Sequence, residues 1–311
     1  MASSSGTPFI SLLEPTPLAW DKTLPPGSQP NLDAIPRTFV DAMTVRTEVF
    51  VREQGIPQEN EFDADDARSA HWVLYASVHQ TVSPAVADPA TGDVVRPRRS
   101  ETRSVPIGTV RLVPFPHPPH PRPGGVYVDG ELVGSADGGG DGQDSQRDPA
   151  AAAAAAAAGS GASTTSAGLP SFQPDRRTTY HDGREPYVKI GRLAVLKSFR
   201  GRGIAAQLIR TAVDWMRKHP RYFDPSPSKA GFERLGMEEG SASSAGGAGE
   251  VGGQPPRWEG LVCCHAQETV VKVYEKCGFK VDEGMGRWME EGIWHVGMFL
   301  RVEVEKDGLD V

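Results

Sequence analysis

The residues best suited to chemistry lie together between Arg200 and Ala205, where the chain reads RGRGIA. Gly201 and Gly203 have no Cβ, so the backbone there can approach an anion closely, and Arg200 and Arg202 add positive charge. An apolar run ends just before this turn, and a helical pattern starts just after it. The N-terminus of a helix carries unpaired N–H groups and the positive end of the helix dipole. The sequence therefore predicts an anion site, of the kind that binds a phosphate group.

Two interpretations of this turn follow from the residues alone. The simpler one is a tight strand-to-helix connection with solvated arginines. The other is a dinucleotide fingerprint, because Gly201, Gly203 and Ala206 fit the pattern G-x-G-x-x-A. Residues 197–200 separate the predicted strand from the first glycine, and Asp224, at the spacing of the expected acidic residue, follows no strand, so this reading is disfavoured. A P-loop is excluded because no Lys-Ser/Thr pair follows the glycines.

Four blocks with regular apolar spacing must position this turn: residues 37–78, 105–115, 186–219 and 258–303. Strands are predicted at residues 71–78, 107–113, 187–195, 261–265 and 295–304, and helices at residues 38–51, 203–218 and 268–277. In the helix 203–218, one face would carry Ile204, Leu208, Ala212, Trp215 and Met216. The pattern predicts an α/β or α+β fold in which helices cover a central sheet.

Three segments between these blocks have compositions that rarely pack: residues 79–104, 117–185 and 220–257. They are rich in Pro, Arg, Gly, Ala and Ser, and the second contains an alanine tract at residues 150–158. Such segments bury too little apolar surface to offset the entropy of ordering. We therefore predict a single domain over residues 37–303, interrupted by disordered low-complexity insertions and preceded by an N-terminal extension, residues 1–36.

Charge and cysteine content narrow the function classes. The net charge is −7 and the pI is about 5.7, which argues against a nucleic-acid-binding module. The three cysteines, Cys263, Cys264 and Cys277, favour a reducing compartment and no zinc site. No apolar run approaches the roughly 20 residues that span a membrane, and the N-terminus lacks a secretory pattern. The expectation is a protein of the cytoplasm, or of the nucleus, with no metal and no membrane partner.

The turn and three further stretches resemble the GNAT superfamily of acyl-CoA N-acyltransferases. Arg200, Gly203 and Ala205 fit the signature Q/R-x-x-G-x-G/A. Residues 45–66 and 291–298 resemble an uncharacterised bacterial-type branch of that superfamily, and residues 273–279 resemble its YEKxGF helix end. A looser similarity links the chain to glucosamine-6-phosphate N-acetyltransferases, which share the Tyr-Glu-Lys-Cys-Gly-Phe run.

The resemblance implies a mixed central sheet flanked by helices, with acetyl-CoA as cosubstrate. Its pantetheine arm would pair with the backbone near Leu193, Ala194 and Val195, in a gap where two strands splay apart. The pyrophosphate would accept N–H groups from the turn formed by Arg200, Gly201, Arg202, Gly203, Ile204 and Ala205. The acceptor amine would attack the thioester directly, so that no covalent enzyme intermediate forms.

Two proton transfers then need side chains. Tyr274 matches the family tyrosine near the CoA sulfur and is the expected acid; its alternative role is packing on the sheet. The glutamate base that many family members carry on the central strand is missing from Tyr187–Arg192, so Glu53 and His71 are the first candidates for the base. Glu291 and His295 are further candidates for the base and, together with Arg46 and Arg192, for substrate binding. A salt bridge or a solvated strand edge is the alternative role of both arginines.

The sequence leaves the acceptor open. A small primary amine or a peptide amine comes first, and an amino-sugar phosphate is the alternative. A non-catalytic acyl-CoA sensor is the alternative of another class. A homodimer is compatible with all three.

Overall fold

The computed structural model describes residues 9–136, 174–224 and 257–304. A large mixed sheet runs through the molecule in the strand order β1-β2-β5-β8-β9-β12-β11-β6-β7, with β10 paired to β12. The central strands are β2 (Ala70–Ser83), β5 (Arg99–Val113), β8 (Tyr187–Val195), β9 (Leu261–Gln267) and β12 (Ile293–Arg301). The flanking strands are β1 (Phe9–Leu13), β6 (Gly125–Val128), β7 (Glu131–Ser135), β10 (Lys280–Val281) and β11 (Arg287–Glu290). Among the strands that the structure describes, only the pairs β8–β9 and β11–β6 are parallel.

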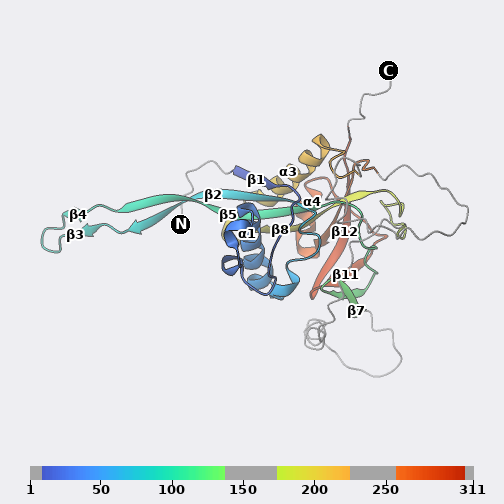
Figure 1. Ribbon diagram of the computed structural model, residues 1–311, viewed down its shortest axis with the longest axis horizontal. Coiled ribbons are helices and arrows are strands. Elements are labelled where there is room, and N and C mark those ends of the chain that lie inside the picture. Colours follow the sequence, from blue (N-terminus) through green and yellow to red (C-terminus); the bar gives the residue numbers. More distant parts are fainter. Residues whose placement is uncertain (1–8, 137–173, 225–256, 305–311) are drawn as a thin grey trace, which may run out of the picture.

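Helices cover both faces of this sheet, as Figure 1 shows, and this confirms the predicted fold class. Side chains alternate between the faces of a strand, and β2 makes the division clear. Its residues Val73 and Tyr75 pack against α1 (Arg37–Arg46). Its residues Trp72 and Leu74 belong to the larger core beneath α3 (Ile204–Lys218) and α4 (Val271–Glu275).

Helix α3 forms where its apolar spacing predicts it. Ile204, Leu208, Ala212 and Met216 recur every fourth residue and are buried, whereas Trp215 is only partly buried. Its first hydrogen bond runs from the Gln207 N–H to the Gly203 carbonyl, 3.0 Å away. Strand β8, which precedes it in the chain, has the predicted bounds, and α3 begins one residue later than predicted. The sequence thus locates the strand-turn-helix unit to within one residue.

The other predicted helices differ in detail. The first continues beyond α1 as a π-helix, Thr47–Glu53, which buries Val49 and Phe50. The last is shorter than predicted, because a 3-10 turn, Glu268–Val270, precedes the five residues of α4. A π-helix or a 3-10 turn has nearly the same apolar spacing as an α-helix, so residue patterns do not distinguish them.

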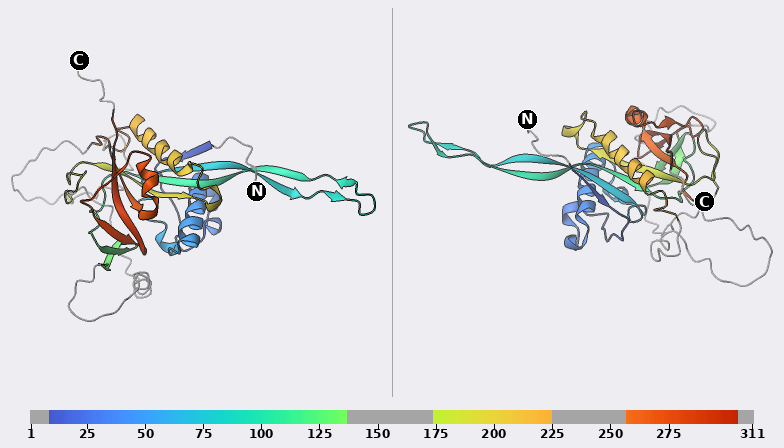
Figure 2. Two further views of the ribbon diagram at one scale, coloured as in Figure 1. Left: turned by 180° about the vertical axis from the view of Figure 1, so that it is seen from behind. Right: turned by 90° about the horizontal axis from the view of Figure 1, so that it is seen from above.

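The segment 79–104, predicted to be a disordered insertion, is ordered over its whole length. Strands β2 and β5 run past the core as a paired ribbon as far as Ser83 and Arg99. The short strands β3 (Val86–Ala87) and β4 (Val94–Arg96) pair near its tip. Figure 2 shows this arm projecting from the body of the molecule. The composition misleads because a ribbon is held by backbone hydrogen bonds, which need no apolar side chains.

The other segments that were predicted to lie outside the packed domain also contain strands and packed side chains. In the N-terminal extension, β1 pairs with β2, and Trp20 packs against Phe39 of α1. In the second insertion, β6 and β7 join the sheet, and His181 is buried. Residues 137–173 of that insertion, including the alanine tract, and residues 225–256 of the third lie outside the described residues. Within the described part of the chain, no helix is long and apolar enough to cross a membrane.

Candidate active site

The site begins where two parallel strands separate. Strands β8 and β9 pair only from Tyr187 with Leu261 to Ile190 with Cys264. Beyond these pairs, β8 continues for five residues and β9 for three, and the two strands no longer pair with each other. The edge of β8 from residue 191 to 195 therefore faces the gap, and its backbone groups have no partner in β9.

A bulge in β8 accompanies this separation. On β5, Thr109 pairs with Ala194 and Arg111 with Gly191, so one residue of β5 faces two residues of β8, Arg192 and Leu193. Arg192 has a positive φ of 48°, which is unusual outside glycine. A bulge bends and twists its strand, and this one lies at the point where β8 leaves β9.

The gap opens into a cleft of about 670 Å³. Its walls come from β8, the turn after it, the start of α3, the π-helix, β9, α4, and the ends of β11 and β12. Of the residues singled out from sequence, the following line the cleft: Glu53, Arg192, Leu193, Ala194, Val195, Arg200, Gly201, Gly203, Ile204, Ala205, Tyr274, Glu291 and His295. Three do not line it: Arg46, His71 and Arg202.

One end of the cleft is the turn at Arg200–Ala205. Gly201 and Gly203 have φ values of 77° and 78°, and no heavy atom lies within 4 Å of a Cβ built on either. The turn is therefore left-handed at two positions and open above the backbone. The first N–H groups of α3 have no partner within the helix. This geometry fits an anion such as a pyrophosphate, and a Cβ here would strain the backbone.

Arg200 does not extend into solvent. Its Nε–H donates to the carbonyl of Val195 at 2.9 Å, and its two terminal nitrogens hold the carboxylate of Glu53 at 2.5 and 2.7 Å. The pKa of Glu53 is lowered, chiefly by this hydrogen bond from Arg200. Glu53, a predicted base, is thus engaged at the turn, and the pair fastens the π-helix to it. Arg202 lies over the ring of Phe199, with 5.4 Å between its Cζ and the ring centroid.

Tyr274 stands on the α3 side of the cleft. Its ring is buried and packs edge-on against Phe279, with 5.5 Å between the centroids. Its hydroxyl has no hydrogen-bond partner among the described residues, and Tyr274 lines the cleft. Burial raises the pKa of Tyr274 well above its usual value, which keeps the phenol neutral.

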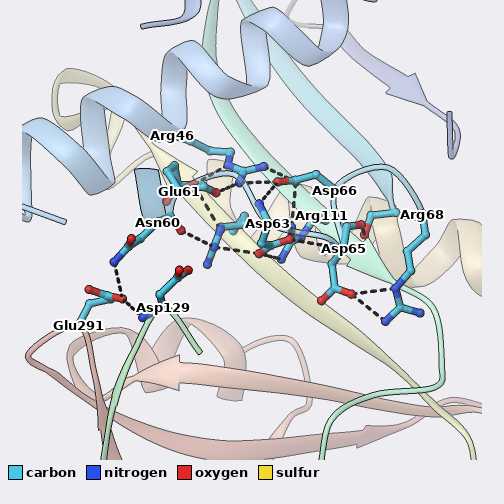
Figure 3. Close-up of polar contacts among 12 residues, drawn as sticks. Arg46, Asn60, Glu61, Asp63, Asp65, Asp66, Arg68, Arg111, Asp129 and Glu291 are labelled. Carbon is cyan, nitrogen blue, oxygen red and sulfur yellow. Dashed lines mark hydrogen bonds and ion pairs between the residues drawn. The ribbon is translucent and has the colours of Figure 1, made fainter. Parts of the chain in front are cut away.

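A buried network of charges lies behind the β8 bulge (Figure 3). Arg46 donates through Nε to Glu61 at 2.5 Å and through Nη1 to Asp66 at 2.6 Å. Arg111 donates to Asp66 at 2.8 Å and to Asp63 at 2.6 Å. Arg192 joins the network through Asp63, 3.0 Å away. The arginines of one helix and two strands, α1, β5 and β8, are thereby bound to a single loop, residues 61–66.

This network corrects two expectations. Arg46, predicted to bind substrate, is fully buried, and its guanidinium forms ion pairs with Glu61 and Asp66. The alternative salt-bridge role is the one observed. His71, a predicted base, is 1% exposed, and its Nε2 lies 2.8 Å from the Asp66 carbonyl. Desolvation lowers the pKa of His71 to about 4. Neither side chain reaches the cleft.

Beyond the bulge, the far end of the cleft carries groups that sequence analysis missed. Glu290 Oε1 accepts the indole N–H of Trp288 at 2.6 Å and lies 3.1 Å from Nδ1 of His265. Despite its burial, the pKa of Glu290 is lowered strongly by the neighbouring His265 and by His295. Burial lowers the pKa of His265. The sequence predicts a strand at residues 261–265, which contains His265, but nothing in the sequence paired His265 with Glu290.

His295 and Glu291 complete this end. Nδ1 of His295 lies 2.8 Å from the carbonyl of Ile293, a contact that makes Nδ1 the protonated nitrogen of the neutral ring. Its Nε2 has no hydrogen-bond partner among the described residues and is not completely enclosed. Because His295 lines the cleft, the lone pair of Nε2 faces the cleft. Glu291 accepts from the side-chain amide of Asn60 at 3.1 Å and from the backbone N–H of Asp129 at 2.7 Å (Figure 3).

The cysteines take no part in this arrangement. Cys263 and Cys264 are fully buried in β9, and burial raises the pKa of Cys263 to about 12. Thiols in such surroundings are inert packing groups. Across residues 9–136, 174–224 and 257–304, no group of three His, Cys, Asp or Glu side chains is placed to hold a metal ion.

One family model matches the chain. Residues 94–236 match the model of the acetyltransferase (GNAT) family. In structure, the chain is similar to an acyl-CoA N-acyltransferase from Pseudomonas aeruginosa, with a TM-score of 0.39 and 14% identity over 95% of this chain and 100% of that one. It is also similar to ElaA from Escherichia coli, with a TM-score of 0.39 and 12% identity over 94% and 99%. At these TM-scores the structural similarities carry no part of the assignment.

None of the curated proteins matches the chain. The resemblance to one bacterial-type branch therefore stays a prediction. The segment that matches the family model contains β8, the turn Arg200–Ala205 and α3, the same residues on which the cleft is built. Residues 94–236 thus match the GNAT family of acetyltransferases, and this match supports an acyltransferase with acetyl-CoA as cosubstrate.

Proposed function

We propose that this chain is an N-acetyltransferase that moves the acetyl group of acetyl-CoA to a primary amine by direct attack. The observation that supports it most is the cleft itself, which joins an anion-accepting turn at Gly201 and Gly203 to an unpaired strand edge at residues 191–195. Pyrophosphate would bind at the turn, and the pantetheine amides would pair with the β8 edge as an added strand. The thioester then lies between Tyr274 and the far end.

His295 is the base that fits best among the four candidates. His71 lies outside the cleft, Glu53 is held by Arg200, and Glu291 is held by Asn60 and by the backbone of Asp129. In His295 the free lone pair is on Nε2 and faces the cleft. Glu290 would stabilise the imidazolium that forms, because its lowered pKa, to which His295 contributes, keeps its carboxylate charged.

In the reaction, the amine nitrogen bonds to the thioester carbon, and its surplus proton passes to Nε2 of His295. The carbon–sulfur bond breaks, and the sulfur leaves with its electron pair. The Tyr274 hydroxyl donates a proton to that sulfur, and the raised pKa of Tyr274 makes the phenolate regain a proton from water. A backbone N–H of the bulged β8 edge would stabilise the oxyanion.

A thermal-shift experiment tests cosubstrate binding. Acetyl-CoA should raise the melting temperature of the wild-type protein, and Gly203→Glu should abolish that shift by placing a carboxylate against the phosphates. Gly203→Ala is the matched control: it adds the same backbone strain without the charge and should keep most of the shift. If no acyl-CoA shifts the wild-type protein, acetyl-CoA binding is disproved, and a larger shift with NAD would favour the dinucleotide interpretation instead.

Release of CoA on a panel of amines tests catalysis. Tyr274→Phe should lower kcat at unchanged acetyl-CoA affinity, by about 10²–10³-fold if the proton transfer limits the rate. Unchanged turnover would remove Tyr274 as the acid. Binding of acetyl-CoA without release on any amine would identify a sensor rather than an enzyme.

A further inference from the structure

One face of the sheet at the far end of the cleft carries a row of basic residues. Arg111 of β5 pairs with Gly191, and on the next strand Lys189 pairs with Val113 and with Cys263. Paired residues share a face, and positions two residues apart on neighbouring strands are diagonal neighbours. Arg111, Lys189 and His265 therefore lie side by side on three adjacent strands, and all three line the cleft.

The charge balance along this row is uneven. Arg111 is neutralised by Asp63 and Asp66, and His265 contacts Glu290. Arg192, nearby on the bulge, is neutralised by Glu61 and Asp63. Lys189 differs from these neighbours: within the described part of the chain, its ammonium has no carboxylate within 4.0 Å and donates no hydrogen bond.

An unused donor lies at the same spot. The Nε–H of Arg111 is buried and has no hydrogen-bond partner among the described residues, whereas Nε of Arg192 lies 3.3 Å from Oε1 of Glu61. Both residues line the cleft. The pKa of His265 is lowered chiefly by burial and in part by the charge of Lys189. Buried N–H groups without partners are rare in folded proteins. Here one accompanies Lys189, a half-buried residue whose ammonium has no counter-charge among the described residues, a combination that a bound anion would satisfy.

We propose that the acceptor amine carries an anionic group, a phosphate or a carboxylate, and that Lys189 binds this group at the far end of the cleft. The inference rests on the acetyl transfer proposed above. It places the amine near His295 and Glu290 and the anion across β9 from them, at β8. A polyamine acceptor is disfavoured, because its further ammonium groups would lie against Lys189 and the two arginines.

Two matched pairs of acceptors test the proposal and separate its two sources of charge: glucosamine against glucosamine-6-phosphate, and serinamide against serine. The full chain is assayed for CoA release at saturating acetyl-CoA. In at least one pair, the anionic member should have a kcat/KM higher by about tenfold or more, mainly through a lower KM. The phosphate pair and the carboxylate pair show which anion is preferred. A preference for the neutral member in both pairs would overturn the proposal.

Lys189→Met should reduce the anionic-to-neutral ratio of kcat/KM by about tenfold. Lys280→Met, which changes an exposed lysine of β10 outside the cleft, should leave the ratio unchanged. A ratio that survives in Lys189→Met would show that the lysine does not bind the anion.

A binding measurement covers the case in which no acceptor turns over. Protein saturated with CoA, whose turn is then occupied, is titrated with inorganic phosphate by calorimetry. Binding by the wild-type protein and Lys280→Met, and its loss in Lys189→Met, would support the anion site even where acetyl transfer fails. Equal binding, or none, in all three proteins would refute the site, whereas a lost thermal shift with acetyl-CoA would refute the proposed function.

Discussion

Arg46 illustrates how a residue can match an expected site by type and serve the fold instead. It is the buried centre of an ion-pair network, with side-chain exposure of 1% against Glu61 and Asp66 at 2% and 0%. Removing one partner of such a network leaves the others buried and uncompensated. The sequence indicated a cation at this position, but the carboxylates that engage it lie 15 and 20 residues away on an irregular loop whose path no periodicity encodes.

We expect Arg46→Met to lower the free energy of unfolding by about 3–5 kcal/mol. The matched control is Arg52→Met, in the next turns of the same helical segment. Its ion pair with Glu48 is exposed on both sides, so the change should stay within about 0.5 kcal/mol. Urea denaturation measures both. A stable Arg46→Met protein with a raised acceptor KM would restore the predicted substrate-binding role.

His71 makes stability dependent on pH. Its pKa falls from an ordinary 6.5 to about 4 in the folded state, first because of desolvation. Between these values the unfolded chain binds a proton that the folded chain does not, so stability must fall as the pH drops through this window. The loss attributable to His71 is on the order of 3 kcal/mol at most. Protonation of Asp66, whose pKa Arg46 and Arg111 hold low, adds to it at lower pH.

His71→Gln should therefore flatten the decline in unfolding free energy between pH 6.5 and 4. His219→Gln, which removes an exposed histidine, should leave the decline as in the wild-type protein. Denaturant midpoints measured across this pH range compare the three proteins. An unchanged slope in His71→Gln would mean that the ring is protonated in the folded state.

At the scale of elements, the strand-turn-helix unit was predictable and the arm was not. The bounds of β8 follow from apolar residues on both faces, and those of α3 from spacing by four. The arm offers no such pattern. Val82, Val86, Val94 and Val95 along it are between 46% and 68% exposed, so burial selects no face and leaves no period to read. The proline and arginine content of residues 79–104 then resembled that of an unpacked insertion.

The same exposure predicts that the arm contributes little to stability. Replacing residues 79–102 by Asn-Gly would join Val78 to Arg103, which are partners in the β2–β5 register. We expect a melting temperature within a few degrees of the wild type and an unchanged shift with acetyl-CoA. By contrast, Trp72→Ala, in the packed part of β2, should cost about 3–5 kcal/mol. A large loss from the arm deletion would show that the ribbon supports the sheet.

For the whole molecule, the cleft is a property of how two groups of strands meet. Strands β1, β2, β5 and β8 form one group, and β9, β12, β11, β6 and β7 the other, joined in the sheet only at the four residue pairs between β8 and β9. The sequence could place the turn and Tyr274 at the site, because both lie in recognisable local motifs. It could not place Lys189, His265 and Glu290 there, because their proximity depends on register between strands far apart in the chain.

This arrangement makes a prediction about the cosubstrate. If the pantetheine arm pairs with the free edge of β8, acetyl-CoA should slow amide hydrogen exchange at residues 191–195 as well as in the turn at Arg200–Ala205, since new hydrogen bonds and exclusion of water both protect amides. Strand β1, at the far edge of the same sheet, is the internal control and should exchange at its original rate. Hydrogen exchange with mass spectrometry resolves these segments. Protection confined to the turn would mean that the phosphates bind while the arm lies elsewhere, and the thioester could then not be placed between Tyr274 and His295.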